Sequence, residues 1–201
     1  MAIDKESLLM NSFEVLMKNY DDNLRNISNL IEKMMNFNID LGTQLWKTVL
    51  TSHPETYKGK ENWDSRYVTV NILSGIERQA DDNYDTCIDI LKSNDLIKSA
   101  VFKHSADLGF PLENILWRAI ARSEYEFVFE CLEMVNTNMS GEETVASFVN
   151  DFVSSYEDEY MLVNDSDEWK SKTMEFIVSL TLLITNEDEK AKAVVSLIDY
   201  M

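Results

Sequence analysis

The residue types of a hydrolytic triad occur close together once in the chain, at His104, Ser105 and Asp107. Adjacent positions on a helix point in different directions, and no Gly-x-Ser-x-Gly turn is present to expose a nucleophilic serine. His104 fits better near a helix C-terminus, where its side chain can interact with free carbonyl groups. We therefore expect no catalytic residue at this cluster.

Other motifs that bind phosphates or metals are also missing from the sequence. It contains no Gly-rich phosphate loop, no His-Glu-x-x-His, no Cys-x-x-Cys and no Glu-x-x-His. The chain from 151 to 167 lacks the alternating acids and central glycine of a calcium-binding loop. The sequence predicts no enzyme, no metal and no cofactor, and an all-α enzyme with an unrecognised carboxylate site stays open as an alternative.

The unusual chemistry of this sequence lies in its carboxylates. Asp and Glu number 36 against 18 Lys and Arg, which gives a formal net charge of −18. Residues 123–169, called the acidic segment below, contain 13 of these acids and no Lys or Arg. A charge of this sign argues against direct binding of nucleic acid or of an anionic membrane. The acids of the segment are Glu124, Glu126, Glu130, Glu133, Glu142, Glu143, Asp151, Glu157, Asp158, Glu159, Asp165, Asp167 and Glu168.

Helical spacing brings several of these acids together. Glu126 and Glu130 are four residues apart, Glu130 and Glu133 are three apart, and each such pair disfavours a helix by roughly 0.2–0.5 kcal/mol. Acids in the first turn of a helix are favoured by its dipole, which accounts for Glu142, Glu143, Asp167 and Glu168. It does not account for Glu130, Glu133, Asp151, Glu157, Asp158 and Glu159. Arg118 and Arg122 are predicted to pair with Glu126 on the acidic helix, with an anion as the alternative.

Two interpretations of the acidic segment stay open. It is either a solvated surface that keeps the protein soluble or a surface that attracts a basic partner, an attraction that salt weakens. Tyr125, Phe129 and Trp169 interleave with the acids as aromatic residues do at interface hot spots, although several also fit a core. The predicted partner-binding residues are Glu126, Glu130, Glu133, Asp151, Glu157, Asp158, Glu159, Tyr156 and Tyr160.

The composition favours a non-enzymatic module that binds a basic protein surface through an acidic helical face. A narrower alternative is a DNA mimic or immunity-type inhibitor of a nucleic-acid-binding enzyme. Carboxylates on successive helical turns repeat at about 5.4 Å, broadly comparable to the phosphate spacing along a strand. The sequence names neither the partner nor the oligomeric state.

The elements that carry these residues are predicted to be helices. Only 5 Gly and 2 Pro are available for tight turns, and apolar residues recur at intervals of three and four almost throughout. The prediction is an all-α fold of stacked antiparallel helix pairs, repeat-like, with about ten helices. It includes helices over 84–92, 96–108, 112–122 and 124–135, and a helix rather than a strand over Tyr67–Val70.

Polar residues mark several predicted helix starts. Asp40 and Asp64 fit as N-caps of the helices that follow them. Three capping boxes combine a short polar cap with a glutamate three residues later. They are Ser140 with Glu143, Asp165 with Glu168, and Asn186 with Glu189.

We expect one domain over 1–201. Its parts are a helical hairpin region over 1–51, a surface loop over 52–63 and a helical stack over 64–201. Cys87 and Cys131 lie among apolar residues, which predicts two buried, reduced thiols. No signal peptide or membrane-spanning stretch is recognised, and the expected location is the cytoplasm.

One window is similar to the two-helix part of an ankyrin repeat. Residues 114–132 read Asn-Ile-Leu-Trp-Arg-Ala-Ile-Ala-Arg-Ser-Glu-Tyr-Glu-Phe-Val-Phe-Glu-Cys-Leu, and 101–107 resemble the end of a preceding repeat. Asn-Ile-Leu-Trp replaces the family's Thr-Pro-Leu-His turn, Ser123 stands where glycine is usual, and no room is left for the β-hairpin finger. No further copy is found, so a generic stack of helix pairs is better supported. The resemblance implies protein recognition without catalysis.

Overall fold

The structure, a computed structural model, describes residues 4–53, 63–79, 83–103, 108–137, 141–155 and 166–200. Within these ranges the chain forms eleven α-helices and one short 3-10 helix, and no strand. The predicted all-α fold of about ten helices is therefore confirmed. The helix Trp63–Glu77 includes Tyr67–Val70, which confirms the helix predicted there in place of a strand.

The chain forms two compact units, Met1–Val101 and Phe102–Met201. The single domain expected over 1–201 stays a prediction. The helices of the N-terminal unit are α1 (Lys5–Met17), α2 (Tyr20–Phe37), α3 (Ile39–Ser52), α5 (Trp63–Glu77), α6 (Asn83–Lys92) and α7 (Asp95–Phe102). The helix predicted over 96–108 ends earlier than expected, at Phe102, since Lys103 and Leu108 lie outside a helix. Residues 104–107, including His104, lie outside the described residues.

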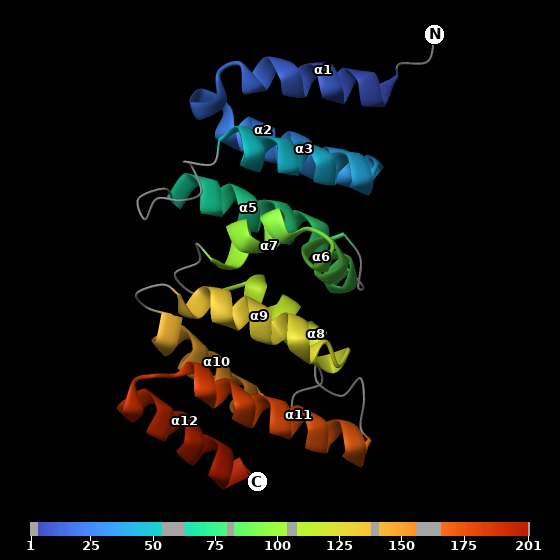
Figure 1. Cartoon of the computed structure of the whole chain (residues 1–201). Helices are drawn as coiled ribbons and strands as arrows, with labels where there is room; N and C mark the ends of the chain where they lie inside the picture. Colours follow the sequence, from blue (N-terminus) through green and yellow to red (C-terminus); the bar gives the residue numbers. More distant parts are fainter. Residues whose placement is uncertain are drawn as a thin grey trace. The chain divides into compact units, whose positions relative to one another are not determined.

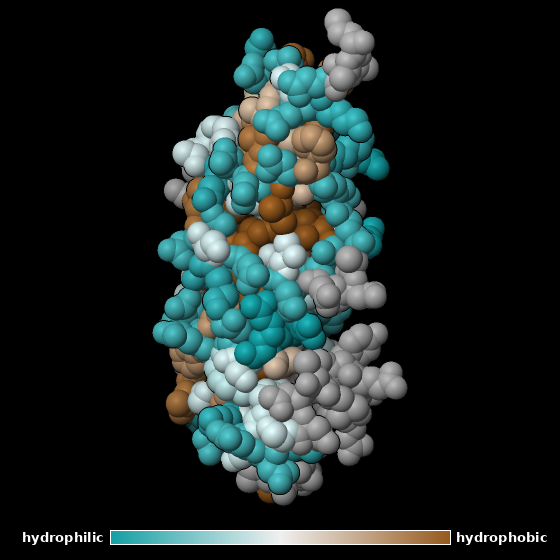
Figure 2. Space-filling view, turned by 90° about the vertical axis from the view of Figure 1, so that its right-hand side faces the viewer, coloured by the Kyte–Doolittle hydropathy of each residue, from teal (hydrophilic) through white to brown (hydrophobic). Residues whose placement is uncertain are grey.

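Helix α2 is the centre of the N-terminal unit, since it contacts α1, α3 and α5 (Figure 1). Its residues Ile27, Ile31 and Met34 are fully buried. Gly42 of α3 lets the backbones approach closely, because an ideal Cβ there would lie 2.7 Å from the backbone nitrogen of Met35. Figure 2 shows hydrophobic residues gathered on one face of this unit, with mostly hydrophilic residues around them.

The start of α3 differs from the prediction in its capping residue. The side-chain oxygen of Asn38 accepts a hydrogen bond from the backbone N–H of Leu41 at 3.1 Å. Asp40, the predicted cap, lies instead in the first turn, where its charge favours the helix dipole. The prediction was wrong by two residues because both side chains can cap and only the backbone decides which one does. Asp64 also falls inside a helix, α5, and its side chain lies outside the described residues.

The helices of the C-terminal unit surround α10. They are α8 (Leu112–Ala121), α9 (Tyr125–Asn136), α10 (Gly141–Ser155), α11 (Asp167–Leu180), the 3-10 helix η2 (Thr181–Leu183) and α12 (Glu187–Tyr200). Helix α10 contacts α9, α11, η2 and α12, and its Val145, Val149 and Phe152 are fully buried. Helix α9 is also tied to η2, because the Asn136 amide donates a hydrogen bond to the Leu183 carbonyl at 2.6 Å.

Two of the three predicted capping boxes can be located in part. The Asn186 side chain accepts hydrogen bonds from the backbone N–H groups of Asp188 and Glu189, so this predicted cap is confirmed. The N-cap of α11 is Ser166, whose hydroxyl accepts from the N–H of Trp169 at 3.3 Å. Asp165, the predicted cap, and Ser140, the cap of the remaining box, lie outside the described residues.

The helix pair α8–α9 covers the ankyrin-like window and turns sharply between its two helices. Ser123 has φ of 61°, a left-handed conformation that favours glycine. The N–H of Ser123 donates to the Ile120 carbonyl and the N–H of Glu124 to the Ala119 carbonyl, the bonding pattern of a Schellman motif. At this position, where the repeat family usually has glycine, the backbone adopts a conformation that favours glycine over the serine present here.

Both cysteines are free and buried, as predicted. Burial, with a smaller contribution from Glu77, raises the pKa of the Cys87 thiol to about 12. Such a thiol stays protonated and behaves as a small apolar side chain. In the described part of the chain, no helix is long and apolar enough to cross a membrane.

Candidate functional site

Helix α9 places three of the predicted partner-binding carboxylates along one side. Glu126 and Glu133 are exposed and Glu130 is half-buried. Their spacing of four and three residues keeps them on the same side of the helix. The opposite side is buried in the core through Phe127, Val128, Cys131, Leu132 and Val135. The sequence therefore orients these acids outward by the same periodicity that buries the apolar residues.

The acidic segment itself contains no Lys or Arg, so positive charge near this surface comes from residues outside the segment. The Arg122 guanidinium forms an ion pair with Glu124, at 3.4 Å between Nη2 and Oε1. The prediction that it pairs with Glu126 was wrong, because the turn at Ser123 brings Glu124 to the guanidinium first. Glu126 and Glu133 thus keep exposed carboxylates with no Lys or Arg on their own helix.

Asp151, another predicted residue, lies exposed on α10 and accepts a hydrogen bond from the Ser147 hydroxyl at 3.1 Å. Its electrostatic neighbour is Glu113 in the first turn of α8. Burial, and then the charge of Asp151, raise the pKa of Glu113 above its usual value. Sequence reasoning missed Glu113, because it lies outside the acidic segment and only the folded chain brings the two charges close enough to interact.

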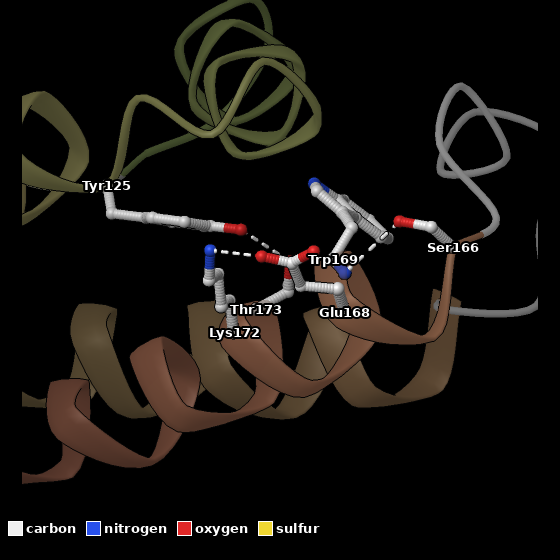
Figure 3. A network of polar contacts seen from close by, with 6 residues as sticks. All are labelled: Tyr125, Ser166, Glu168, Trp169, Lys172 and Thr173. Carbon is white, nitrogen blue, oxygen red and sulfur yellow. Dashed lines mark hydrogen bonds and ion pairs between the residues drawn. The ribbon is translucent and has the colours of Figure 1, made fainter.

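The aromatic residues of the segment mainly join helices. The Tyr125 hydroxyl lies 2.8 Å from Oγ1 of Thr173 on α11 (Figure 3). The centroid of its ring lies 4.9 Å from that of the Phe176 ring. Trp169 is buried with 5% of its surface exposed, and Phe129 is half-buried. Tyr125 therefore joins α9 to α11, and Trp169 of α11 belongs to the core of the unit.

Five of the nine predicted partner-binding residues lie outside the described residues. They are Tyr156, Glu157, Asp158, Glu159 and Tyr160. The described part of the predicted site therefore consists of four carboxylates: three share the outer side of α9, and the fourth lies on α10.

Helices α11 and α12 each pair an acid with a lysine on their own surface. The Lys172 ammonium forms an ion pair with Glu168 at 2.7 Å on α11, as Figure 3 shows, and Lys192 does so with Glu189 at 2.6 Å on α12. The hydrogen bond from Lys172 lowers the pKa of Glu168, and the same bond raises the pKa of Lys172. Within each pair the two residues lie three or four positions apart. At the same spacing, α9 places one acid beside another.

Metal-ligating side chains do not gather at the described part of this surface. Within the described ranges, no group of three or more His, Cys, Asp or Glu side chains could hold a metal ion. His53 stacks on Tyr20 with ring centroids 3.6 Å apart, which gives this histidine a packing role. His104 lies outside the described residues.

Comparisons with known proteins yield no match to a family model, to a curated protein or to a solved structure.

Proposed function

We propose that this protein binds a basic protein surface through the acidic outer side of α9 and the neighbouring carboxylates of the acidic segment. The observation that carries the proposal is that Glu126, Glu130 and Glu133 share one side of a helix that contains no Lys or Arg. Like charges at this spacing disfavour the helix, and of the three acids only Glu126 lies in the first turn, where the helix dipole favours a negative charge. A basic partner would neutralise them and would be attracted over a long range at low salt.

Electrostatic complementarity of this kind mainly affects association rate and specificity. Exposed carboxylates at the rim of an interface contribute little energy individually, and apolar contacts from the partner would supply the rest. Because Tyr125 and Trp169 are engaged in helix packing, the aromatic contacts expected within the segment reduce to Phe129 and to the tyrosines at 156 and 160.

The test compares two triple variants with equal charge change. The first carries Glu126→Gln, Glu130→Gln and Glu133→Gln on α9. The control carries Glu14→Gln, Asp40→Asn and Glu175→Gln, three exposed acids on three other helices. Each protein is immobilised, partners are captured from a lysate at low salt, and the captured protein is identified and purified for direct binding measurements.

We expect the purified partner to be basic, to dissociate faster in high salt and to lose binding to the α9 variant only. Equal weakening by both triple variants would show that net charge, rather than this surface, attracts the partner. Binding unaffected by the α9 variant, or a partner insensitive to salt, would contradict the proposal directly.

The narrower version, a mimic of nucleic acid, rests on the carboxylate positions at 126, 130 and 133, which follow successive turns of α9. It makes an additional demand on the same experiment. A short DNA or RNA duplex should compete with this protein for the purified partner, whereas a partner that binds both at once would contradict mimicry but leave the acidic interface intact.

A further inference from the structure

A groove in the N-terminal unit carries a second set of charged residues, away from the acidic segment. It lies between α2 and α5 and encloses about 620 Å³. This volume falls within the range of about 300–1,000 Å³ found for small-molecule sites. The charged and amide side chains that line it are Asp21, Asp22, Arg25, Asn29, Glu32, Asn71 and Arg78.

The close packing of the two helices in this groove depends on Gly75 of α5. An ideal Cβ at Gly75 would lie 2.6 Å from Cδ of Glu32 on α2. The Glu32 side chain therefore lies directly against the α5 backbone, in space that any other residue at position 75 would occupy. A glycine in a helix interior lowers the stability of that helix. The space that Gly75 leaves for the Glu32 side chain therefore comes at some cost in the stability of α5.

The opposite charges that line the groove do not neutralise one another. Asp21 precedes Arg25 by four residues, a spacing that supports ion pairs along a helix. In the part of the chain that the structure describes, however, neither Arg25 nor Arg78 has an ion pair or hydrogen bond through its guanidinium. Both side chains are exposed, so their planar donor groups are free to bind a carboxylate.

We propose that this groove binds a small zwitterion, a compound with a carboxylate and an ammonium group, of which free amino acids are the simplest class. Arg25 and Arg78 supply guanidinium donors for the carboxylate. Asp21, Asp22 and Glu32 supply acceptors for the ammonium group. Because these three carboxylates outnumber the two guanidiniums, the groove disfavours phosphate and other dianions. The inference concerns a different unit from the proposed protein-binding surface and does not depend on it.

The first test is a titration of the ¹⁵N-labelled full chain at constant ionic strength, followed by its amide chemical shifts. The probes are glycine, L-glutamate and L-arginine, with acetate, methylammonium and inorganic phosphate as single-charge-type controls. We expect at least one amino acid to shift the amides of Asn29, Asn71 and Ser74 in a saturable manner at concentrations up to about 10 mM. Absence of saturation with all three, or tighter binding of phosphate, overturns the proposal.

The second test uses variants that change the groove without touching the core. Arg25→Gln and Arg78→Gln are each expected to weaken amino acid binding about tenfold or more, because a bidentate charged contact is lost. Lys33→Gln is the matched control, since it removes one exposed positive charge from α2 at a residue that does not line the groove. An equal loss with Lys33→Gln would show that the effect is one of net charge and would overturn the assigned site.

Gly75→Ala tests the position of Glu32 without changing any charge. The added methyl group must displace the Glu32 side chain from α5. We expect weaker binding of the amino acid, while the amide shifts of α1 and α3, which belong to the same unit as the groove, stay unchanged and so report intact folding. Unaltered affinity in this variant would exclude Glu32 from the site, and unaltered affinity in both arginine variants would refute the site itself.

Discussion

Helices α9 and α11 belong to the same unit and treat their surface charges in opposite ways. On α11, Lys172 follows Glu168 by one turn and forms an ion pair with it at 2.7 Å. On α9, the same one-turn spacing joins Glu126 to Glu130, two carboxylates that repel. Helix α12 resembles α11, with Lys192 beside Glu189. The fold can therefore accommodate lysine at such positions, and the acids of α9 are not a requirement of helix formation.

The difference between α9 and α11 concerns helix stability on one hand and the proposed binding role of α9 on the other. A surface selected only for stability would gain from lysine on α9, because alternating charges support a helix and like charges oppose it. Glu113 and Asp151 extend the imbalance to α8 and α10, since their mutual repulsion contributes to the raised pKa of Glu113. The proposed partner surface lies on this side of α9, and the following variants probe what distinguishes it from α11.

The largest effect is expected from the contact that joins the two helices. Tyr125→Phe removes the hydroxyl that lies 2.8 Å from Oγ1 of Thr173, a residue with no exposed surface. A buried hydroxyl left without this partner should lower the free energy of unfolding by about 1–2 kcal/mol. Urea denaturation measures the change.

The double variant Tyr125→Phe with Thr173→Val serves as the control for that contact. Replacement of both partners by apolar groups is expected to recover part of the loss, because neither hydroxyl is then buried without a partner. Equal destabilisation by the single and double variants would mean that the tyrosine ring position, rather than the hydrogen bond, joins α9 to α11.

The second effect concerns the turn that starts α9. Ser123→Gly should raise the free energy of unfolding by about 0.5–1 kcal/mol, because glycine adopts φ of 61° without the strain that serine bears there. Part of the gain is offset by the greater freedom of glycine in the unfolded chain. Ser123→Ala keeps the strain and is expected to give no gain. A destabilised glycine variant would show that the Ser123 side chain contributes a contact that outweighs the strain.

The sequence was sufficient for the helices and insufficient for details that depend on packing. Apolar spacing located α8, α9 and α10 because helices bury one side, and the polar cap at Asn186 was recognisable because its oxygen serves nearby backbone N–H groups. The sequence could not show whether Asn38 or Asp40 caps α3, since both have suitable side chains.

Some features of the candidate site also follow from local sequence, and others depend on residues far apart in the chain. The outward side of α9 follows from periodicity alone, whereas the effect of Asp151 on Glu113 requires two helices separated by many residues to pack. The partner of Arg122 was also misassigned, because the left-handed turn at Ser123 redirects the chain just after the arginine. Single residues in unusual backbone conformations thus decide contacts that spacing does not predict.

A smaller effect is expected when α9 is given the charge pattern of α11. Glu133→Lys places a cation three residues after Glu130 and near the C-terminal end of α9, where the helix dipole favours it. The free energy of unfolding should rise by about 0.2–0.5 kcal/mol at low salt, and the gain should shrink in 1 M NaCl. Glu126→Lys is the control, because a cation in the first turn opposes the dipole and is expected to gain less. Equal gains at both positions would show that reduced net charge, rather than helical pairing, stabilises the protein.

The smallest effect is a pH dependence from Glu113. Its pKa is raised in the folded chain, so the folded state binds a proton that the unfolded state has already released. This contribution is fully favourable below the ordinary glutamate pKa of 4.5 and is lost as the pH rises through the higher folded pKa. The side chain is only half-buried, and screening by water keeps the effect small.

Glu113→Gln should therefore lose less stability than the unaltered protein between pH 4.5 and neutral pH in urea denaturation. Asp151→Asn should lower the Glu113 pKa toward its usual value, because it removes the neighbouring charge, while the burial that contributes most to the shift persists. A parallel pH profile in Glu113→Gln would assign the dependence to other acids and would remove Glu113 from the charge imbalance that distinguishes α8–α10 from α11.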